Sequence, residues 1–175
     1  SSGPDTKQQN IRDGYFKMMN EAEKNIYITT PYFVPDDGIF SALKVAALSG
    51  IDVRIIIPAN PDHPFVYWAS MSYLGELLEA GVKCYEYNEG FVHSKTVYVD
   101  GFVTSVGTAN MDIRSFDLNF EVNAFIYDRE IAAEHEAQFL KDIENCTEIT
   151  KEWYEKRSGW FQVKEAISRL ISPML

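Results

Sequence analysis

Cysteine is scarce in this sequence, and that scarcity excludes a disulfide-stapled scaffold. Only Cys84 and Cys146 occur among the 175 residues, and their separation fits no metal-ligand spacing. We therefore expect two free thiols in a reducing compartment. Long apolar runs are lacking too. None approaches the roughly 18 residues needed to cross a bilayer, and no signal peptide opens the chain.

Basic residues are outnumbered, with 16 Lys and Arg against 26 Asp and Glu, which gives a formal net charge of −10. Phosphate backbones are bound by clustered Lys and Arg, so this balance argues against nucleic acid as a partner. It also argues against adsorption on a bare anionic membrane. Hydrophobic residues make up 46% of the chain, so a core can form and global disorder is excluded.

The chain begins with serine rather than methionine. We interpret residues 1–5 as a linker or a processing remnant, and the chain as a piece of a longer protein. Residues 6–149 are expected to form one catalytic domain. Residues 150–175 are expected to form a C-terminal helical segment rich in aromatic and basic residues. On this interpretation the missing membrane anchor does not argue against a membrane enzyme.

The first half of the chain alternates helix and strand. The expected order is helix 6–24, strand 25–30, helix 37–49, strand 51–57, a helix from the 60–64 loop to residue 80, and strand 82–87. This order predicts a three-layer α/β/α sandwich with a mixed, largely parallel central sheet. Strands at 92–100 and 102–106 are then expected to form a hairpin at Asp100-Gly101. A strand at 119–127 and a helix at 130–145 follow.

The last 26 residues differ from the rest, because they carry a net charge of +2 and many large apolar side chains. We expect two short helices, broken at Ser158-Gly159. Two interpretations of this segment remain open. The apolar side chains of residues 160–172 pack on the core of the domain, which we slightly favour, or the segment docks at a lipid headgroup layer.

A polar constellation between residues 93 and 110 carries the chemistry. On a strand, His93 and Lys95 would point to the same face, roughly 6–7 Å apart. Thr108 and Asn110 follow the second strand of the hairpin and can fold back toward them. The set offers one nucleophile and three donors for anionic oxygens, which suits a phosphodiester: Lys95, Thr108 and Asn110 hold the charge while His93 attacks phosphorus.

The spacing His93-x-Lys95-x4-Asp100-x6-Gly107-Thr108-x-Asn110 resembles the HKD motif of the phospholipase D superfamily. Thr108 stands where that family often has serine. Three segments, 30–35, 58–64 and 107–123, closely resemble the C-terminal catalytic half of bacterial cardiolipin synthases. The resemblance covers nearly the whole chain.

The resemblance implies a role for each matching residue. His93 matches the histidine that becomes a phosphohistidine intermediate, and Lys95 and Asn110 match phosphate-binding residues assisted by Thr108. Glu121 stands where a carboxylate orients the catalytic histidine, fixing its tautomer. Asp100 matches the third letter of the motif, although its place at a hairpin turn favours a structural role.

The resemblance also points to a substrate channel lined by Tyr32 and Phe33, for which plain core packing is an equal alternative. His63 follows the carboxyl end of a strand, where ligands bind in open sheets. It is therefore a candidate for headgroup contact, with a plain turn role as the alternative. No cofactor is implied, and no cluster of Asp, Glu and His predicts a metal site.

The family's active site uses two HKD motifs, and this chain has one. A second histidine is needed to protonate the leaving alcohol and then to deprotonate the incoming one. We expect it from a missing N-terminal half, with a homodimer partner as the alternative. The implied substrates are phosphatidylglycerol and membrane lipid. The implied location is the cytoplasmic side of the cell membrane, where the chain would be a peripheral domain.

The resemblance implies phosphatidyl transfer between two phosphatidylglycerol molecules, which gives cardiolipin and glycerol. Three alternatives remain. One is a phospholipase D that uses water as acceptor. Another is a phosphodiesterase or nuclease of the same superfamily, against which the net charge of −10 argues. The third is a non-catalytic partner half, disfavoured because every motif position is present.

Overall fold

A computed structural model describes residues 1–5 and 8–172 of the chain. The strands are β1 (Asn25–Thr29), β2 (Phe33–Val34), β3 (Asp52–Pro58), β4 (Lys83–Tyr87), β5 (Thr96–Val99), β6 (Val103–Gly107), β7 (Met111–Asp112), β8 (Asn123–Tyr127) and β9 (Cys146–Ile149). The helices are α1 (Asn10–Asn20), α2 (Asp37–Leu48), α3 (Pro64–Glu79), α4 (Ile113–Asp117), α5 (Arg129–Ile143), α6 (Lys151–Glu155) and α7 (Gly159–Ile171).

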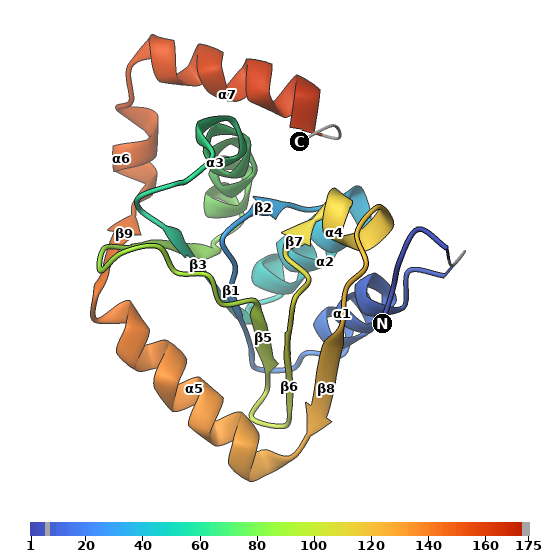
Figure 1. The fold of residues 1–175 in the computed structure, drawn as a ribbon. Helices are drawn as coiled ribbons and strands as arrows, with labels where there is room; N and C mark the ends of the chain where they lie inside the picture. Colours follow the sequence, from blue (N-terminus) through green and yellow to red (C-terminus); the bar gives the residue numbers. More distant parts are fainter. Residues whose placement is uncertain (6–7, 173–175) are drawn as a thin grey trace.

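A seven-stranded sheet in the order β8-β6-β5-β1-β3-β4-β9 forms the middle layer (Figure 1). Helices α1, α2 and α3 bury their apolar sides on one face, in the larger core cluster. Helix α5 covers the other face, where Phe139 stacks on Tyr27 and Tyr27 on Tyr98. The predicted α/β architecture, with a mixed sheet and helices on both faces, is confirmed.

The expectation that the sheet is largely parallel is wrong in its detail. Only β1–β3 and β3–β4 pair in parallel in the described sheet. The pairs β1–β5, β5–β6, β6–β8 and β4–β9 are antiparallel. After β4 the chain passes to the other side of β1, where β5, β6 and β8 lie next to one another with antiparallel pairing, and α5 then leads across the sheet to β9 beside β4.

Local sequence signals set several element ends. The side chain of Asp36 accepts hydrogen bonds from the backbone N–H groups of Gly38 and Ile39, which caps α2 as its position predicted. Asp100 (φ +57°) and Gly101 (φ +64°) form the turn between β5 and β6. Two successive positive φ angles are what a tight hairpin turn requires, so the predicted hairpin is confirmed.

Several predicted boundaries are wrong. Strand β5 begins at Thr96 instead of residue 92, and β8 begins at Asn123 instead of residue 119. Helix α1 spans Asn10–Asn20, shorter than predicted, and residues 6 and 7 lie outside the described residues. Within residues 1–5, interpreted as a linker or a processing remnant, Ser2 is buried and exchanges two backbone hydrogen bonds with Glu121.

The C-terminal segment forms α6 and α7, divided near Ser158 as expected, with residues 173–175 outside the described part. Helix α7 lies across α3, on the outside of the sandwich (Figure 1). The helix packs on the domain, but the favoured expectation that the apolar side chains of residues 160–172 pack on its core is wrong. Its buried residues are Glu165, Ser168 and the capping Ser172, whereas Trp160 and Leu170 are exposed.

Candidate active site

The pairing of the strands gathers the predicted site residues at one edge of the sheet. Thr29, the last residue of β1, pairs with Thr96, the first of β5, and Gly107 at the end of β6 pairs with Asn123 at the start of β8. The segments flanking those ends therefore meet. They carry His93 and Lys95 before β5, Thr108 and Asn110 after β6, Glu121 before β8, Tyr32 after β1 and His63 after β3.

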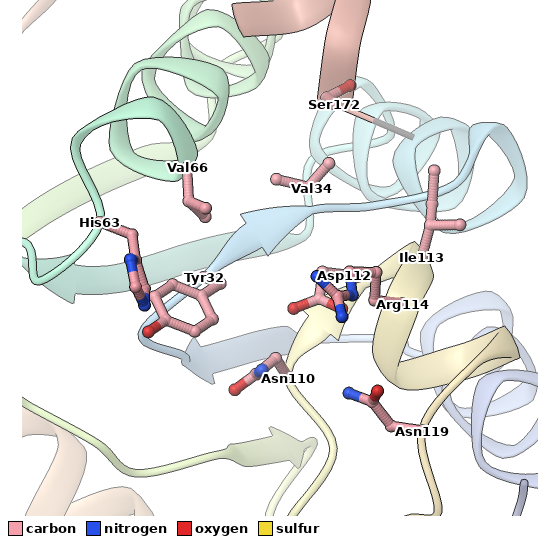
Figure 2. A pocket seen from close by; sticks show the side chains of 10 residues that line it. All are labelled: Tyr32, Val34, His63, Val66, Asn110, Asp112, Ile113, Arg114, Asn119 and Ser172. Atoms are coloured by element: carbon pink, nitrogen blue, oxygen red, sulfur yellow. The ribbon is translucent and has the colours of Figure 1, made fainter. Parts of the chain in front are cut away.

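A cavity of about 180 Å³ opens at this edge (Figure 2). Its lining comprises Tyr32, Val34, His63, Val66, Asn110, Asp112, Ile113, Arg114, Asn119 and Ser172. Three sequence predictions, Tyr32, His63 and Asn110, thus share one cavity. The Tyr32 hydroxyl donates to Asp62 over 2.6 Å, and the rings of Tyr32 and His63 lie 6.1 Å apart.

Asn110 contributes a buried side-chain amide to the lining. Its amide NH2 donates to the carboxylate of Asp112, while its Oδ1 is buried and has no hydrogen-bond partner among residues 1–5 and 8–172. Figure 2 shows the side chain directed toward the side of the cavity where Tyr32 and His63 lie. An amide oxygen can pair only with a donor, so it is the NH2 group of Asn110 that could donate to an anionic oxygen in the cavity.

Lys95 lies in the loop before β5, not on the strand as predicted, and its Nζ donates to the backbone carbonyl of His93 over 2.9 Å. Burial lowers the pKa of Lys95, and the carboxylates of Glu121, Asp112 and Asp62 partly oppose that shift. Lys95 is therefore within electrostatic reach of the cavity, since Asp112 lines it and Asp62 binds its Tyr32. A half-buried ammonium gains from an anionic ligand.

His93 is exposed, and its ring stacks on Phe91 with 5.6 Å between centroids. The strand geometry predicted for His93 and Lys95 is wrong, because both residues precede β5. His93 does not line the cavity, although the adjacent Lys95 backbone is tied to Gly107. Its imidazole is thus free of hydrogen-bond partners among the described residues and accessible at the same sheet edge.

Glu121 does not bond to His93 in the part of the chain that the structure describes, so the predicted orienting contact is missing. Its carboxylate instead accepts from the Asn119 amide over 3.4 Å. The backbone of Glu121 is held by Ser2. Through space its charge acts on Lys95 and raises the pKa of Asp112, whose own burial is the larger cause of that rise.

Thr108 and Phe33 have structural contacts. The Thr108 hydroxyl accepts from the backbone N–H of Val122 over 3.0 Å, so it ties the end of β6 to the segment before β8. Phe33 is fully buried in the core and does not line the cavity, which excludes it from the predicted channel wall and leaves Tyr32 alone there.

Asp100 lies at the opposite end of β5 from His93 and Lys95. Its carboxylate accepts from the backbone N–H groups of Glu23 (2.6 Å), Lys24 (2.8 Å) and Asn25 (2.9 Å). A direct catalytic part, as the motif position suggested, does not fit this placement. Asp100 ties the hairpin turn to the start of β1. It thereby aligns β1 with β5, whose other ends carry the site.

We predict that Asp100→Ala lowers the free energy of unfolding by about 1–3 kcal/mol, because three backbone donors lose their acceptor. Urea unfolding of the 175-residue chain measures this effect. In the complete enzyme, the turnover of the folded fraction should stay within a few-fold of the parent protein. A folded Asp100→Ala enzyme of unchanged stability and without turnover would contradict the structural role.

The sequence interpretation missed the acidic side of the site. Asp62 and Asp112 were not predicted as site residues. Asp112 caps α4 by accepting from the backbone N–H of Ser115, so a cap position before a short helix was the available signal. Within residues 1–5 and 8–172, no group of three or more His, Cys, Asp or Glu is arranged to hold a metal ion.

Comparison with known proteins places the chain among related sequences. The family described as "Cardiolipin synthase, PLD-like domain" matches residues 15–143. Cardiolipin synthases of Listeria monocytogenes serotype 4a (strain HCC23) and Clostridium perfringens (strain SM101 / Type A) are 56% and 55% identical over all 175 residues. The chain spans only 36% and 37% of the length of these relatives.

Two solved structures share the fold. Nuc, a phospholipase D family member from Salmonella typhimurium, superimposes with a TM-score of 0.71 at 19% identity, over 79% of this chain and 90% of Nuc. A phosphatidylserine synthase of Haemophilus influenzae Rd KW20 gives a TM-score of 0.74 at 17% identity, over 95% of this chain and 45% of that one. At such identities the likeness concerns the fold alone.

Proposed function

Since the chain belongs to the family of cardiolipin synthase phospholipase D-like domains, we propose that it forms one half-site of a phosphatidyltransferase. The reaction joins two phosphatidylglycerol molecules and gives cardiolipin and glycerol. The observation that carries the proposal is the convergence of Lys95, Asn110 and His93 at one sheet edge, beside the cavity that Asn110 lines. We assign residues 6–149 to the catalytic domain and residues 150–175 to an accessory segment.

The proposed chemistry runs in two displacements. An imidazole nitrogen of His93, or of its counterpart in the other half-site, forms a bond to phosphorus while the bond from phosphorus to the glycerol oxygen breaks. A second histidine, as imidazolium, gives its proton to the departing glycerol. The same histidine then takes the proton of the incoming phosphatidylglycerol hydroxyl, whose oxygen displaces the imidazole from phosphorus and restores the free nucleophile.

Lys95 and Asn110 would hold the phosphoryl oxygens during both displacements. The lowered pKa of Lys95 reflects burial of its ammonium, and a bound phosphodiester would offset that burial. The gain is largest where the negative charge is greatest, in the transition state, so Lys95 serves catalysis as well as binding. Thr108 would act indirectly: its hydroxyl accepts a hydrogen bond from the Val122 backbone and so fixes the segment that carries Asn110.

The second histidine must come from outside this chain, because His63 and His135 lie in no second HKD motif. An N-terminal half of a longer protein is the source we favour, since the curated relatives are nearly three times as long. A second copy of this chain is the alternative. We further propose a peripheral position on the cytoplasmic side of the cell membrane. Among the described residues, no helix is long and apolar enough to span a bilayer.

Labelled lipid and labelled oligonucleotide, given side by side to the complete enzyme, test the function. We expect phosphatidylglycerol to yield cardiolipin and glycerol in equal amounts, with the oligonucleotide intact. Phosphatidic acid as the main product would identify water as the acceptor and a phospholipase D. A cleaved oligonucleotide would identify a nuclease. No turnover with either substrate would favour a non-catalytic partner half.

A further inference from the structure

Helix α7 is amphipathic, but it is packed with its polar side inward. Glu165, Ser168 and the capping Ser172 are at most 5% exposed. Helix α7 lies against α3 (Figure 1), and the Ser172 hydroxyl pairs with the Tyr73 hydroxyl of α3 at 3.3 Å. A helix on the surface of a soluble domain normally does the reverse and buries its apolar stripe.

Ion pairs and ring contacts fix this orientation. Arg157 and Glu165 form an ion pair in which both side chains are almost fully buried. Arg169 pairs with Glu76 of α3 over 3.2 Å, and its guanidinium lies 3.5 Å from the Tyr73 ring centroid. Turning the helix to bury its apolar side would separate a buried charge pair, which costs several kcal/mol.

The outward side of α7 is a continuous apolar stripe. Its members recur at the three- and four-residue spacing that places side chains on one helix face. They are Trp160 (67% exposed), Val163 (46%), Ile167 (52%), Leu170 (82%) and Ile171 (36%). Within the described chain no element covers this stripe, which we call the α7 apolar face.

The apolar face continues onto α3 through a lysine set among aromatic rings. The Lys164 ammonium lies 4.5 Å from the ring centroid of Trp68 and 5.5 Å from that of Phe161. Trp68 in turn contacts Phe65, with 5.4 Å between ring centroids, and Phe65 is half exposed. Trp and Phe beside Lys is the composition of segments that lie at a membrane–water interface.

The α7 apolar face also borders the candidate active site. Ser172, which follows the last turn of α7, lines the cavity, as does Val66, the neighbour of Phe65 (Figure 2). A partner bound to the α7 apolar face therefore lies next to the mouth of the cavity. For a substrate that resides in a bilayer, this arrangement shortens the path from the lipid layer to Asn110.

We propose that the α7 apolar face docks on the interfacial region of an anionic lipid bilayer. The choice of lipid over protein rests on charge, on composition and, for the substrate, on the proposed function. Residues 150–172 carry a net charge of +2 in a chain of net charge −10, so the attraction to anionic headgroups is confined to the segment that bears the apolar stripe.

Vesicle sedimentation of the 175-residue chain tests the proposal. The probes are vesicles of pure phosphatidylglycerol and of pure phosphatidylcholine. We expect binding to phosphatidylglycerol vesicles, and at least tenfold weaker partitioning for the double variant Ile167→Gln/Leu170→Gln, because two exposed apolar side chains no longer enter the interface. The matched control is Val45→Gln/Leu48→Gln, which removes two equally exposed side chains from α2 and should bind as the parent chain does.

Each outcome decides the proposal. Absence of binding by the parent chain overturns it, as does equal binding by the α7 variant and the parent. Light scattering without lipid adds a second check. A dimer that dissociates in the α7 variant would make this face a protein contact and overturn docking on lipid. Failure of the complete enzyme to make cardiolipin, with α7-dependent vesicle binding intact, would reject the proposed function and leave the docking surface standing.

Discussion

Replacing His93 with alanine in the complete enzyme is expected to reduce cardiolipin formation by about 10³-fold or more, the scale seen when a nucleophile or its proton-transfer partner is removed. The folded structure should survive, since the His93 side chain is exposed and stacks on the Phe91 ring, and the hydrogen bond from Lys95 goes to the backbone carbonyl that alanine retains. Turnover of labelled phosphatidylglycerol measures the loss, and circular dichroism with urea unfolding checks the fold.

His135→Ala is the matched control. His135 lies on α5, where its Nδ1 pairs with the Thr104 hydroxyl at 2.8 Å, away from the cavity described above. Its replacement should leave turnover within a few-fold of the parent enzyme. If the His93 variant kept most of its turnover while folding normally, the assignment of His93 to the chemistry would be wrong.

The second large effect is expected at Lys95. Lys95→Ala should lower turnover by about 10²–10³-fold, as the loss of one preorganised donor to a developing oxyanion does. The comparison variant is Lys83→Ala, which removes an ammonium whose partner is Asp52 on β3, remote from the site. Equal small effects of both variants would mean that Lys95 contributes only general charge.

The pH profile separates a charge role of Lys95 from a packing role. Burial lowers the pKa of Lys95 from its ordinary 10.5, so the ammonium is lost as the pH rises through that lowered value, earlier than for a lysine in water. Turnover should decline over the same alkaline range. In Lys95→Arg the guanidinium stays charged, so the decline should move to higher pH, at a reduced maximal rate. An unmoved decline would assign it to another group.

The fold was predictable where a short-range signal exists. Asp36 caps α2, Asp100-Gly101 turns the hairpin, and the helix–strand alternation up to β4 gives the parallel part of the sheet. The two-residue strands β2 and β7 and the short helix α4 have no periodicity to detect. They form because Phe33 and Met111 meet only in the folded chain.

The site was predictable as a set of residue types, but less so as a geometry. The spacing from His93 to Asn110 located the correct sheet edge. It misplaced His93 and Lys95 on a strand. Val92 suggested that the strand begins there, but β5 begins only at Thr96, after these polar residues. The position of Asp62 beside Tyr32 depends on tertiary packing, which no local pattern encodes.

The C-terminal helix shows why composition alone misleads. Its many apolar residues predicted burial against the core, yet Arg157 and Tyr154 bind Glu165 on the inner side. Two polar partners, Tyr154 on α6 and Arg157 in the turn after it, therefore decide which face of α7 is turned inward. That choice leaves the apolar stripe available for the bilayer docking proposed above.

The central claim is that this chain holds one half of a two-histidine site. The most direct test is light scattering on the 175-residue chain, followed by phosphatidylglycerol turnover on the same fractions. We predict that a monomeric fraction makes no cardiolipin, because one histidine cannot supply both the nucleophile and the proton donor. A monomer that converts phosphatidylglycerol to cardiolipin and glycerol at the rate of the complete enzyme would contradict the claim.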